Sequence, residues 1–297
     1  MKNSLDNFCM NSKKIGSRKP KDYIDTRAFW DKGYKGNNIV VAVIDTGCEI
    51  KHIEIQDNII DGYNFLESNE SNIRSYNDDN GHGTHVAGII AGKNIGIAPN
   101  SKILALKVLD RSGSGSVNNL IRSINYAIEW TGPNNEKVRI ISISLGSQKP
   151  NNELYAAIKR ANRENISVVV ASGNEGDGTR SPKKRYPGYY NEVIQVGALH
   201  DLETVASFSN NNDEIDLVAP GYRIYSSYIN NEYKELSGTS MAAPFVAGSL
   251  ALIINAMEDK FNRSLTETEV YAQLIKRTKP ITGNCMIEGN GSLNLFI

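Results

Sequence analysis

The sequence predicts a three-layer α/β fold in which a mostly parallel central sheet carries helices on both faces. Short runs rich in Val and Ile have the composition of strands buried on both faces, and they occur at residues 38–44, 103–108, 139–143, 167–171 and 193–196. Stretches with helical periodicity lie between several of them, at residues 82–91, 117–130 and 152–165. Alternation of this kind is typical of a parallel sheet, because each strand needs a crossover connection to reach the next one.

The last third of the chain departs from this alternation. Residues 215–236 contain strand-length pieces broken by Pro220-Gly221 and Asn230-Asn231, which predicts turns and hairpins. Two helical patterns, at residues 240–257 and 266–277, finish the fold. The earlier of these is also the longest apolar run. It contains Pro and Gly and is too short to span a bilayer, so we expect a buried core helix there.

Composition bounds the class of protein. With hydrophobic residues at 40% and charged residues at 22% of 297 positions, the chain can bury a large core and is not disordered. Lys plus Arg and Asp plus Glu both number 33, so the whole-chain charge predicts neither a nucleic-acid partner nor a membrane partner.

We expect one domain in the cytoplasm. The N-terminus is polar and basic and lacks the apolar run of a secretory signal. Cys9, Cys48 and Cys285 are odd in number and scattered, which fits reduced thiols rather than a disulfide framework. Neither a repeat nor a linker rich in Pro, Gly or Ser marks a second domain. The prediction is a loose leader over residues 1–21 and a single domain over residues 22–297.

Three polar side chains fall where such a fold gathers functional groups. Asp45 directly follows the first predicted strand, His82 lies in the first turn of a helix, and Ser240 stands where a loop becomes a helix. In open α/β sheets, functional groups collect at the carboxyl ends of the strands. The chain order Asp, His, Ser is one of the three known orders of the hydrolase triad.

Each residue type answers a chemical need. A serine hydroxyl is a poor nucleophile until a base removes its proton, and a histidine does this near neutral pH. The imidazole must be held in one tautomer and stabilised as a cation, which a buried aspartate does. A nucleophile at a helix N-terminus also places unpaired backbone N–H groups beside the developing oxyanion. Asn174, just past another strand end, offers a side-chain donor to the same oxyanion.

Every one of these residues also has an ordinary structural interpretation. Alone, Asp45 after a strand is typical of a turn or helix cap, and Ser240 is a good N-cap. His82 and His85 have a spacing that metal ligands use, but neither an HExxH pattern nor a third ligand accompanies them. Asn174 in a glycine-rich turn is typical of left-handed backbone. Their joint occurrence, in this order and at loop ends of one sheet, favours catalysis.

Five segments carry a resemblance to a known family. They are DTG at Asp45, GHGTHVAG at His82, SLG at Ser144, ASGNEG around Asn174 and GTSMAAP at Ser240. These segments resemble the signatures of the subtilisin family of serine proteases, and the likeness extends over residues 35–279. Within that family, the chain is most similar to the intracellular subtilisins of Gram-positive bacteria, through DTGC, SNNNDEIDLVAPG at 209–221 and LTETEVYAQLIKRTKP at 265–280.

The resemblance implies a subtilisin-like fold, a triad of Asp45, His82 and Ser240, and an oxyanion hole completed by Asn174. It also implies two segments that bind peptide as added β-strands and a wall for the side chain that precedes the scissile bond. The strand segments are Gly113-Ser114-Gly115 and Ser144-Leu145-Gly146, and the wall residues are Ala171, Ser172 and Gly173. A simple flexible loop over residues 112–116 is the alternative for the first segment.

Arg185 falls at the base of that pocket, where many relatives carry a small residue. We expect the arginine either to shorten the pocket or to favour an acidic substrate side chain. A solvated run of charge over residues 183–185 is the alternative interpretation.

Metal sites are considered only because the resemblance implies them. The stretch after His85 is several residues shorter than the family's loop around a tight calcium ion, so we do not expect that site, although Glu54 matches one of its carboxylates. A weaker calcium or sodium site is expected from the carbonyls of Gly188, Tyr190 and Val193 with the carboxylate of Asp216, because oxygen ligands suit both ions.

The predicted function is a serine endopeptidase that hydrolyses extended or unfolded polypeptides through an acyl-enzyme intermediate. No cofactor is expected for catalysis. The partners are peptide or protein substrates, without nucleic acid or membrane, and the resemblance is compatible with a homodimer. Two alternatives remain: a binding protein on an inactive protease fold, and a maturation protease dedicated to one peptide.

Overall fold

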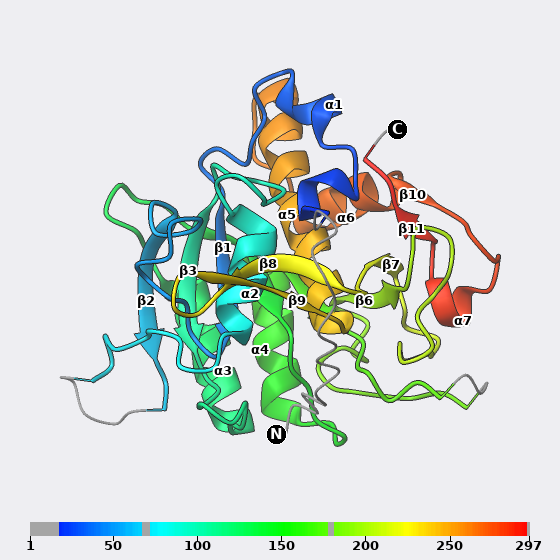
Figure 1. The fold of residues 1–297 in the computed structure, drawn as a ribbon, viewed down its shortest axis with the longest axis horizontal. Helices are drawn as coiled ribbons and strands as arrows, with labels where there is room; N and C mark the ends of the chain where they lie inside the picture. The colour runs from blue at the N-terminus through cyan, green and yellow to red at the C-terminus, as the bar shows by residue number, and fades with distance from the viewer. Residues whose placement is uncertain (1–17, 67–71, 178–180, 296–297) are drawn as a thin grey trace.

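The computed structural model describes residues 18–66, 72–177 and 181–295 (Figure 1). Residues 1–17 of the predicted leader lie outside this part. The remaining leader residues contact the domain, because Pro20 is buried in the 3-10 helix Pro20–Asp22 and the Lys21 N–H donates to the Ile95 carbonyl at 3.2 Å. Packing against the domain therefore begins by Pro20.

A nine-stranded sheet forms the centre of the molecule, in the order β10-β11-β7-β6-β5-β4-β1-β3-β2. Its neighbouring strands pair in parallel except β10 with β11. The strands are β1 Val40–Asp45, β2 Ile59–Asn64, β3 Lys102–Lys107, β4 Val138–Ile143, β5 Ser167–Ala171, β6 Ile194–Leu199, β7 Leu217–Pro220, β10 Thr278–Lys279 and β11 Ser292–Leu293.

Helices cover both faces of the sheet, which confirms the predicted three layers (Figure 1). One hydrophobic cluster contains Val41 and Val43 of β1, and the other contains Val40, Ala42 and Ile44, so that successive side chains of the strand enter opposite cores. The first cluster includes residues of α2 His82–Ala91, α5 Thr239–Phe261 and α6 Glu267–Ile275. The second includes residues of α3 Val117–Glu129 and α4 Asn152–Arg163. Two short helices, α1 Arg27–Trp30 and α7 Cys285–Glu288, complete the helices in the described residues.

The five predicted strands and five predicted helices are confirmed, with boundaries that differ by a few residues. The prediction for residues 215–236 is partly wrong. Strand β7 joins the main sheet in parallel beside β6 instead of turning back, because Pro220 ends a buried strand rather than forming a hairpin. The predicted hairpin exists further on, between β8 Ile224–Tyr228 and β9 Glu232–Leu236. Three residues separate the paired Tyr228 and Glu232, and two of them, Asn230 and Asn231, have the positive φ that asparagine tolerates in turns.

The expectation that the longest apolar run is too short to span a bilayer is wrong, because helix α5 has 23 residues and by length and composition alone could cross a membrane. Yet 83% of its most apolar window is buried inside the fold. It packs against α2 and against the sheet, with Phe245 and Leu250 fully buried. The expected core helix is thus confirmed.

The β8–β9 hairpin lies across α2 (Figure 1), and His85 connects them. The Nε2 atom of His85 donates to the carbonyls of Ile224 at 2.9 Å and Lys234 at 3.0 Å. In return, the hydroxyls of Ser226 and Ser227 donate to carbonyl oxygens of α2. Burial lowers the pKa of His85 to about 3, so the imidazole joining helix and hairpin is neutral.

We predict that acidification destabilises the fold through His85. Unfolded histidine has a pKa near 6.5, so between that value and the folded value of about 3 the unfolded state binds a proton that the folded state does not. The contribution of His85 to the free energy of unfolding should be fully present above pH 6.5. At lower pH this contribution should decrease by about 1.4 kcal/mol per pH unit. Urea unfolding of a Ser240→Ala background, which prevents self-digestion, measures this slope from pH 7 to 4.5. His85→Gln should show a shallower slope, and equal slopes would contradict the assignment.

Candidate active site

Asp45 and His82 form a buried hydrogen-bonded pair. Asp45 is the last residue of β1 and His82 the first of α2, and the His82 Nδ1 atom donates to the Asp45 carboxylate at 2.7 Å. Both side chains are almost fully buried, at 1% and 2% exposed. The backbone N–H of Thr46 donates to the same carboxylate oxygen at 2.8 Å. This arrangement leaves the other ring nitrogen, Nε2, as the proton acceptor of the imidazole.

Close backbone approach brings the two residues together. A side chain at Gly83 would meet the Gly47 carbonyl at 2.1 Å, so only glycine lets the start of α2 lie this near the end of β1. The Gly83 N–H also donates to the Thr46 hydroxyl at 2.9 Å. The glycine after His82 in the sequence therefore has a packing role.

Ser240 is the second residue of α5, and a proline one turn later frees its carbonyl. Pro244 has no N–H, so it cannot donate to the carbonyl of Ser240 as the helix pattern would require. The Ser144 hydroxyl donates to that carbonyl instead, at 3.2 Å. The Ser240 hydroxyl in turn donates to the Ser144 carbonyl at 3.3 Å. Since Ser144 directly follows β4 and Ile143 pairs with Ile44, this contact places Ser240 at the same sheet edge as Asp45.

The structure does not join Ser240 to His82 by a hydrogen bond. The His82 Nε2 atom is buried and has no hydrogen-bond partner within the described residues. In enzymes without substrate, catalytic hydrogen bonds are often long or poorly aligned and tighten only on binding.

Asn174 is held with its amide in a defined orientation. Its Oδ1 accepts both the N–H and the hydroxyl of Thr239, each at 2.9 Å. The Thr239 hydroxyl also accepts the Gly173 N–H at 3.1 Å. Because the Asn174 oxygen is occupied by the residue that precedes Ser240, its NH₂ group is the part left to donate toward the nucleophile.

Charge near His82 sets the pKa of its imidazole. Burial alone would lower that pKa, but the charge of Asp45, the hydrogen bond to it and the charge of Asp78 outweigh burial and raise the pKa above 6.5.

Asp45, His82 and Ser240 thus lie at one edge of the sheet, and comparison with known proteins decides the family. A model of the subtilase family, Peptidase_S8, matches residues 36–294. The chain belongs to the subtilase family. As a subtilase it is a serine endopeptidase, and its catalysis needs no cofactor.

Individual relatives agree over most of the chain. The intracellular serine protease of Paenibacillus polymyxa is 46% identical over 280 residues, which cover 92% of this chain and 84% of the relative. The major intracellular serine protease of Bacillus subtilis (strain 168) is 47% identical over 274 residues, or 90% of this chain and 84% of the relative. Subtilisin DY of Bacillus licheniformis is 37% identical over 270 residues, or 89% and 92%.

The loop that contains Gly113, Ser114 and Gly115 is organised by one carboxylate. Asp110 accepts the backbone N–H groups of Ser112 at 2.8 Å and Ser114 at 3.0 Å, together with the Ser112 hydroxyl at 2.7 Å. These bonds lower the pKa of Asp110. The loop thus has a fixed local conformation, and its sequence of small residues alone did not reveal this.

Arg185 lies between Gly173 of the predicted pocket wall and Gly146 of the predicted substrate-binding strand. Its Cβ and Cγ atoms would lie 3.5 and 3.0 Å from a Cβ added to Gly146 and Gly173, respectively. The guanidinium pairs with Glu175 at 2.5 Å, and its side chain is only 19% exposed. Asn210 continues the network, because its amide donates to Glu175 and to the Ser172 carbonyl, each at 2.8 Å.

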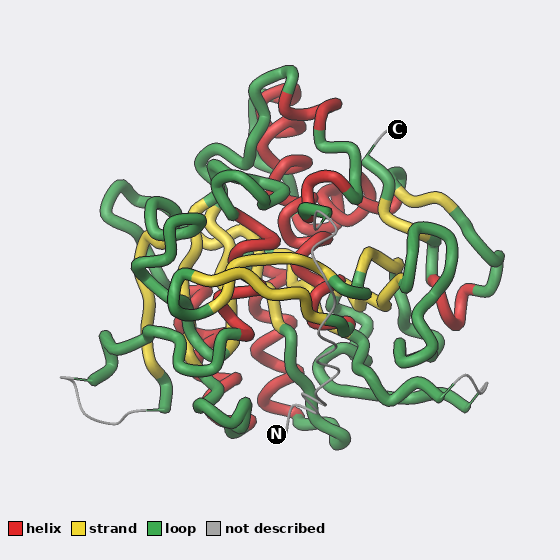
Figure 2. Tube along the Cα trace, viewed as in Figure 1, coloured by secondary structure: helices red, strands yellow, loops and turns green. Residues whose placement is uncertain are grey.

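These contacts identify a partner that the sequence did not. Arg185 and Glu175 are ten residues apart in the long connection from β5 to β6, seen at the lower right of Figure 2. The described residues of this connection form neither a helix nor a strand. Tyr186 pairs with Ser147 through two backbone hydrogen bonds, which brings the connection against the segment after β4.

The carboxylates considered for metal ions are occupied by protein donors. Glu54 accepts the Asn94 N–H at 2.8 Å and the Tyr233 hydroxyl at 3.0 Å, so it ties a shortened loop to the hairpin. Asp216 accepts the Gln195 N–H at 2.7 Å and the Tyr271 hydroxyl at 2.6 Å, and burial raises its pKa to about 6. The described residues hold no group of three or more His, Cys, Asp or Glu side chains that could bind a metal. The cation site at Gly188, Tyr190, Val193 and Asp216 stays a prediction.

We predict that kcat/KM increases with pH through an apparent pKa above 6.5. The base must be neutral to accept the serine proton, and the raised pKa of His82 keeps the imidazole protonated at lower pH. Activity is therefore lost as pH falls through that value. The pH profile of kcat/KM with a peptide substrate measures it, and an acid limb below pH 6 would contradict the assignment.

Proposed function

We propose that this subtilase cleaves extended polypeptides with Ser240 as nucleophile, His82 as general base and then acid, and Asp45 as the group that orients the imidazole. The observation that carries the proposal is the buried 2.7 Å bond between His82 and Asp45 at the sheet edge where Ser240 begins α5. The printed names of the two intracellular serine proteases agree with this activity.

In the proposed reaction, the Ser240 oxygen attacks the substrate carbonyl while its proton passes to His82 Nε2. The Asp45 carboxylate stabilises the resulting imidazolium. The oxyanion accepts hydrogen bonds from the Ser240 N–H and the Asn174 amide, helped by the positive end of α5. His82 then gives the proton to the leaving amine, and a water molecule repeats the sequence to release the acyl group.

We further propose that substrate lies as an extended strand between Gly113-Ser114-Gly115 and Ser144-Leu145-Gly146. Backbone hydrogen bonds to both segments would hold any extended sequence, since they do not read side chains. The organised loop at Asp110 and the fixed end of β4 support this, because a preformed binding strand loses little entropy on binding.

The remaining assignments concern the cellular location, the bound ions and the assembly of the enzyme. Two relatives carry the word intracellular in their names, and with the polar N-terminus this supports a cytoplasmic location. A structural calcium or sodium ion at the carbonyls of residues 188, 190 and 193 belongs to the proposal, with Asp216 oriented by Gln195 and Tyr271. Assembly into a homodimer stays a prediction.

Hydrolysis of casein by the purified chain tests the nucleophile. Ser240→Ala should abolish hydrolysis, and a serine-directed sulfonyl fluoride should do the same to the unmodified chain. Ser249→Ala is the matched control, because it makes the same change nine residues along α5, where the hydroxyl bonds only locally to the Phe245 carbonyl at 2.8 Å. Equal activity of Ser240→Ala and Ser249→Ala would refute the assignment. No activity in the wild type would favour an inactive fold or a dedicated maturation substrate.

For substrate choice, we propose that Arg185 shortens the pocket for the residue before the scissile bond. The ion pair with Glu175 supports this over a preference for acidic side chains, since the guanidinium charge is already compensated. Burial of most of the side chain disfavours a solvated charge run.

Peptides that differ only at this residue test the pocket. The wild type should cleave after Ala better than after Phe, and Arg185→Gly should improve kcat/KM for Phe relative to Ala by about tenfold or more, the scale of a change in pocket volume. Lys183→Gly removes a neighbouring charge, paired with Asp177, and serves as the control. A wild-type preference for Phe would refute the shortened pocket, and a preference for Glu would restore the acidic interpretation.

A further inference from the structure

We propose that Asp78 is a positioning residue for His82: its carboxylate fixes the first turn of α2, and with it the imidazole, relative to Asp45. The inference rests on the proposed role of His82 as the base. It assigns a task to a residue outside the triad and the oxyanion hole.

The first turn of α2 is capped by side chains from outside the helix. Asn80 accepts the N–H of His82 at 3.1 Å, Thr46 accepts that of Gly83 at 2.9 Å, and Asp78 accepts that of Thr84. Gly81 occupies the N-cap position and has no side chain to accept the exposed N–H groups. One oxygen of Asp78 accepts the N–H groups of Asn80 at 3.0 Å and Gly81 at 2.9 Å. The other accepts the N–H of Thr84 at 2.9 Å and its hydroxyl at 2.6 Å. Two of these four bonds hold Thr84 in the first turn, and the other two hold the segment that leads into it, all on one buried carboxylate at the positive end of the helix.

The same residues are tied to the loop that follows Asp45. The Asp78 N–H donates to the Cys48 carbonyl at 3.2 Å, and the Thr84 hydroxyl accepts the Glu49 N–H at 2.9 Å. Movement of the helix start relative to the end of β1 would break these bonds as well as those of the cap. Asp78 thus links the two elements that carry the base and its orienting carboxylate.

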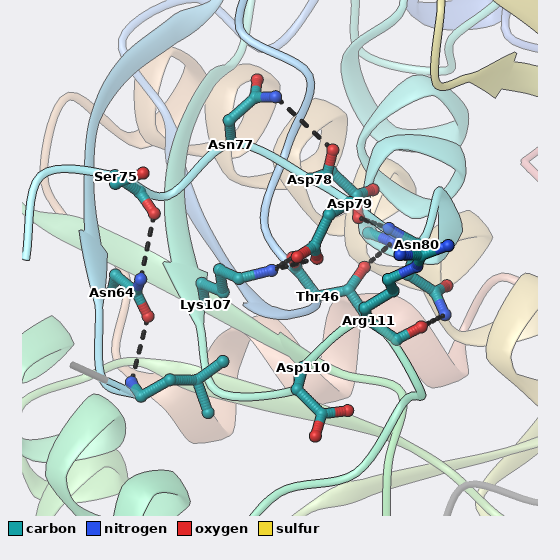
Figure 3. Close-up of polar contacts among 12 residues, drawn as sticks. Thr46, Asn64, Ser75, Asn77, Asp78, Asp79, Asn80, Lys107, Asp110 and Arg111 are labelled. Atoms are coloured by element: carbon teal, nitrogen blue, oxygen red, sulfur yellow. Dashed lines mark hydrogen bonds and ion pairs between the residues drawn. The ribbon is translucent and has the colours of Figure 1, made fainter. Parts of the chain in front are cut away.

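The neighbouring carboxylate has a different task. Asp79 is 54% exposed and pairs with the ammonium of Lys107 at 2.6 Å, and Lys107 also donates to the Thr46 carbonyl at 2.6 Å (Figure 3). Through Lys107, Asp79 therefore stabilises the loop that follows β1. These contacts do not cap α2. Asp79→Asn is accordingly a matched control for Asp78→Asn, because it neutralises the adjacent residue without removing the cap.

Several charged or titratable groups surround His82 from the elements packed around it. They are Asp45 on β1, Asp78 before α2 and His85 on α2. Cys48 in the loop after β1 interacts in turn with the two carboxylates and with Lys107 on β3. Asp45 and Asp78 both act to raise the pKa of His82 against burial. Removal of the Asp78 charge should consequently lower that pKa, an effect that loss of packing alone would not produce in this direction.

The first test measures the pKa of His82 directly and does not depend on activity. In a Ser240→Ala background, proton NMR titration should give His82 a lower pKa in Asp78→Asn than in the parent, while Asp79→Asn leaves it near the parent value. In the active chain, Asp78→Asn should lower kcat about ten- to a hundred-fold with KM little changed, because misplacement of the base affects the chemical step. The acid limb of kcat/KM should move to lower pH in this variant only.

A folded Asp78→Asn variant with unchanged His82 titration, or an equal shift in Asp79→Asn, would overturn the proposal. Should Asp78→Asn fail to fold, Thr84→Val keeps the charge and the volume and removes one bond to the carboxylate. It should lower kcat at unchanged KM, and wild-type kcat would overturn the proposal too. If the unmodified chain hydrolyses nothing while the NMR shift appears, the proposed function fails and the role of Asp78 stands.

Discussion

The hydrogen bond between His82 and Asp45 is the constraint on which the active-site half of the fold depends. A carboxylate and an imidazole are both costly to bury unless each is paired, and here both are almost fully buried. The pair forms only if β1 and α2 approach to backbone distance, which Gly83 permits. The loops after β1 and before α2 must then run side by side, and the bonds from Asp78, Thr84 and Lys107 hold them so.

Helix α5 supplies the other half of the site under a different constraint. It must be apolar to fill the core beneath the sheet, and its first turn must still present polar groups. Pro244 meets both requirements, because it is apolar and has no N–H to donate to the Ser240 carbonyl. That carbonyl is therefore free to accept the Ser144 hydroxyl. Ser240, the proposed nucleophile, is thereby tied to the end of β4, whose partner strand β1 ends in Asp45. The proline in GTSMAAP therefore contributes to the placement of Ser240 without taking part in the chemistry.

Local patterns explain which parts of this structure could be predicted from the sequence. Strands buried on both faces are apolar throughout, so β1, β3, β4, β5 and β6 were recognisable, whereas β2 reads IIDGYN and lies at the sheet edge with polar and small residues. The four-residue strand β7 is too short to show periodicity, and its closing proline reads equally well as a turn. The proposed catalytic residues could be singled out from the sequence because each lies in a contiguous motif.

Long-range partners could not be predicted in the same way. Asp78 and Asp79 are chemically identical neighbours, and only the fold turns one toward α2 and the other toward Lys107. Likewise, Arg185 in a run of three cations was indistinguishable from a solvated charge until its pairing with Glu175 was seen. Such roles depend on where distant segments pack, which a single sequence does not encode locally.

The two histidines of α2 show how strongly placement decides chemistry. They are three residues apart on one short helix and equally buried, yet the pKa of His82 is raised and that of His85 is lowered. Two carboxylates outweigh burial at His82 and raise its pKa. At His85 burial lowers the pKa, and the hydrogen bonds to the carbonyls of Ile224 and Lys234 offset this only in part. On acidification His82 protonates first, which strengthens its bond to Asp45 and would stop catalysis by the proposed triad. His85 stays neutral to far lower pH and opposes folding only below 6.5, since there the unfolded chain gains the proton. As the pH falls, loss of activity should therefore precede loss of structure. Helix α2 should still be packed against the β8–β9 hairpin when His82 is protonated.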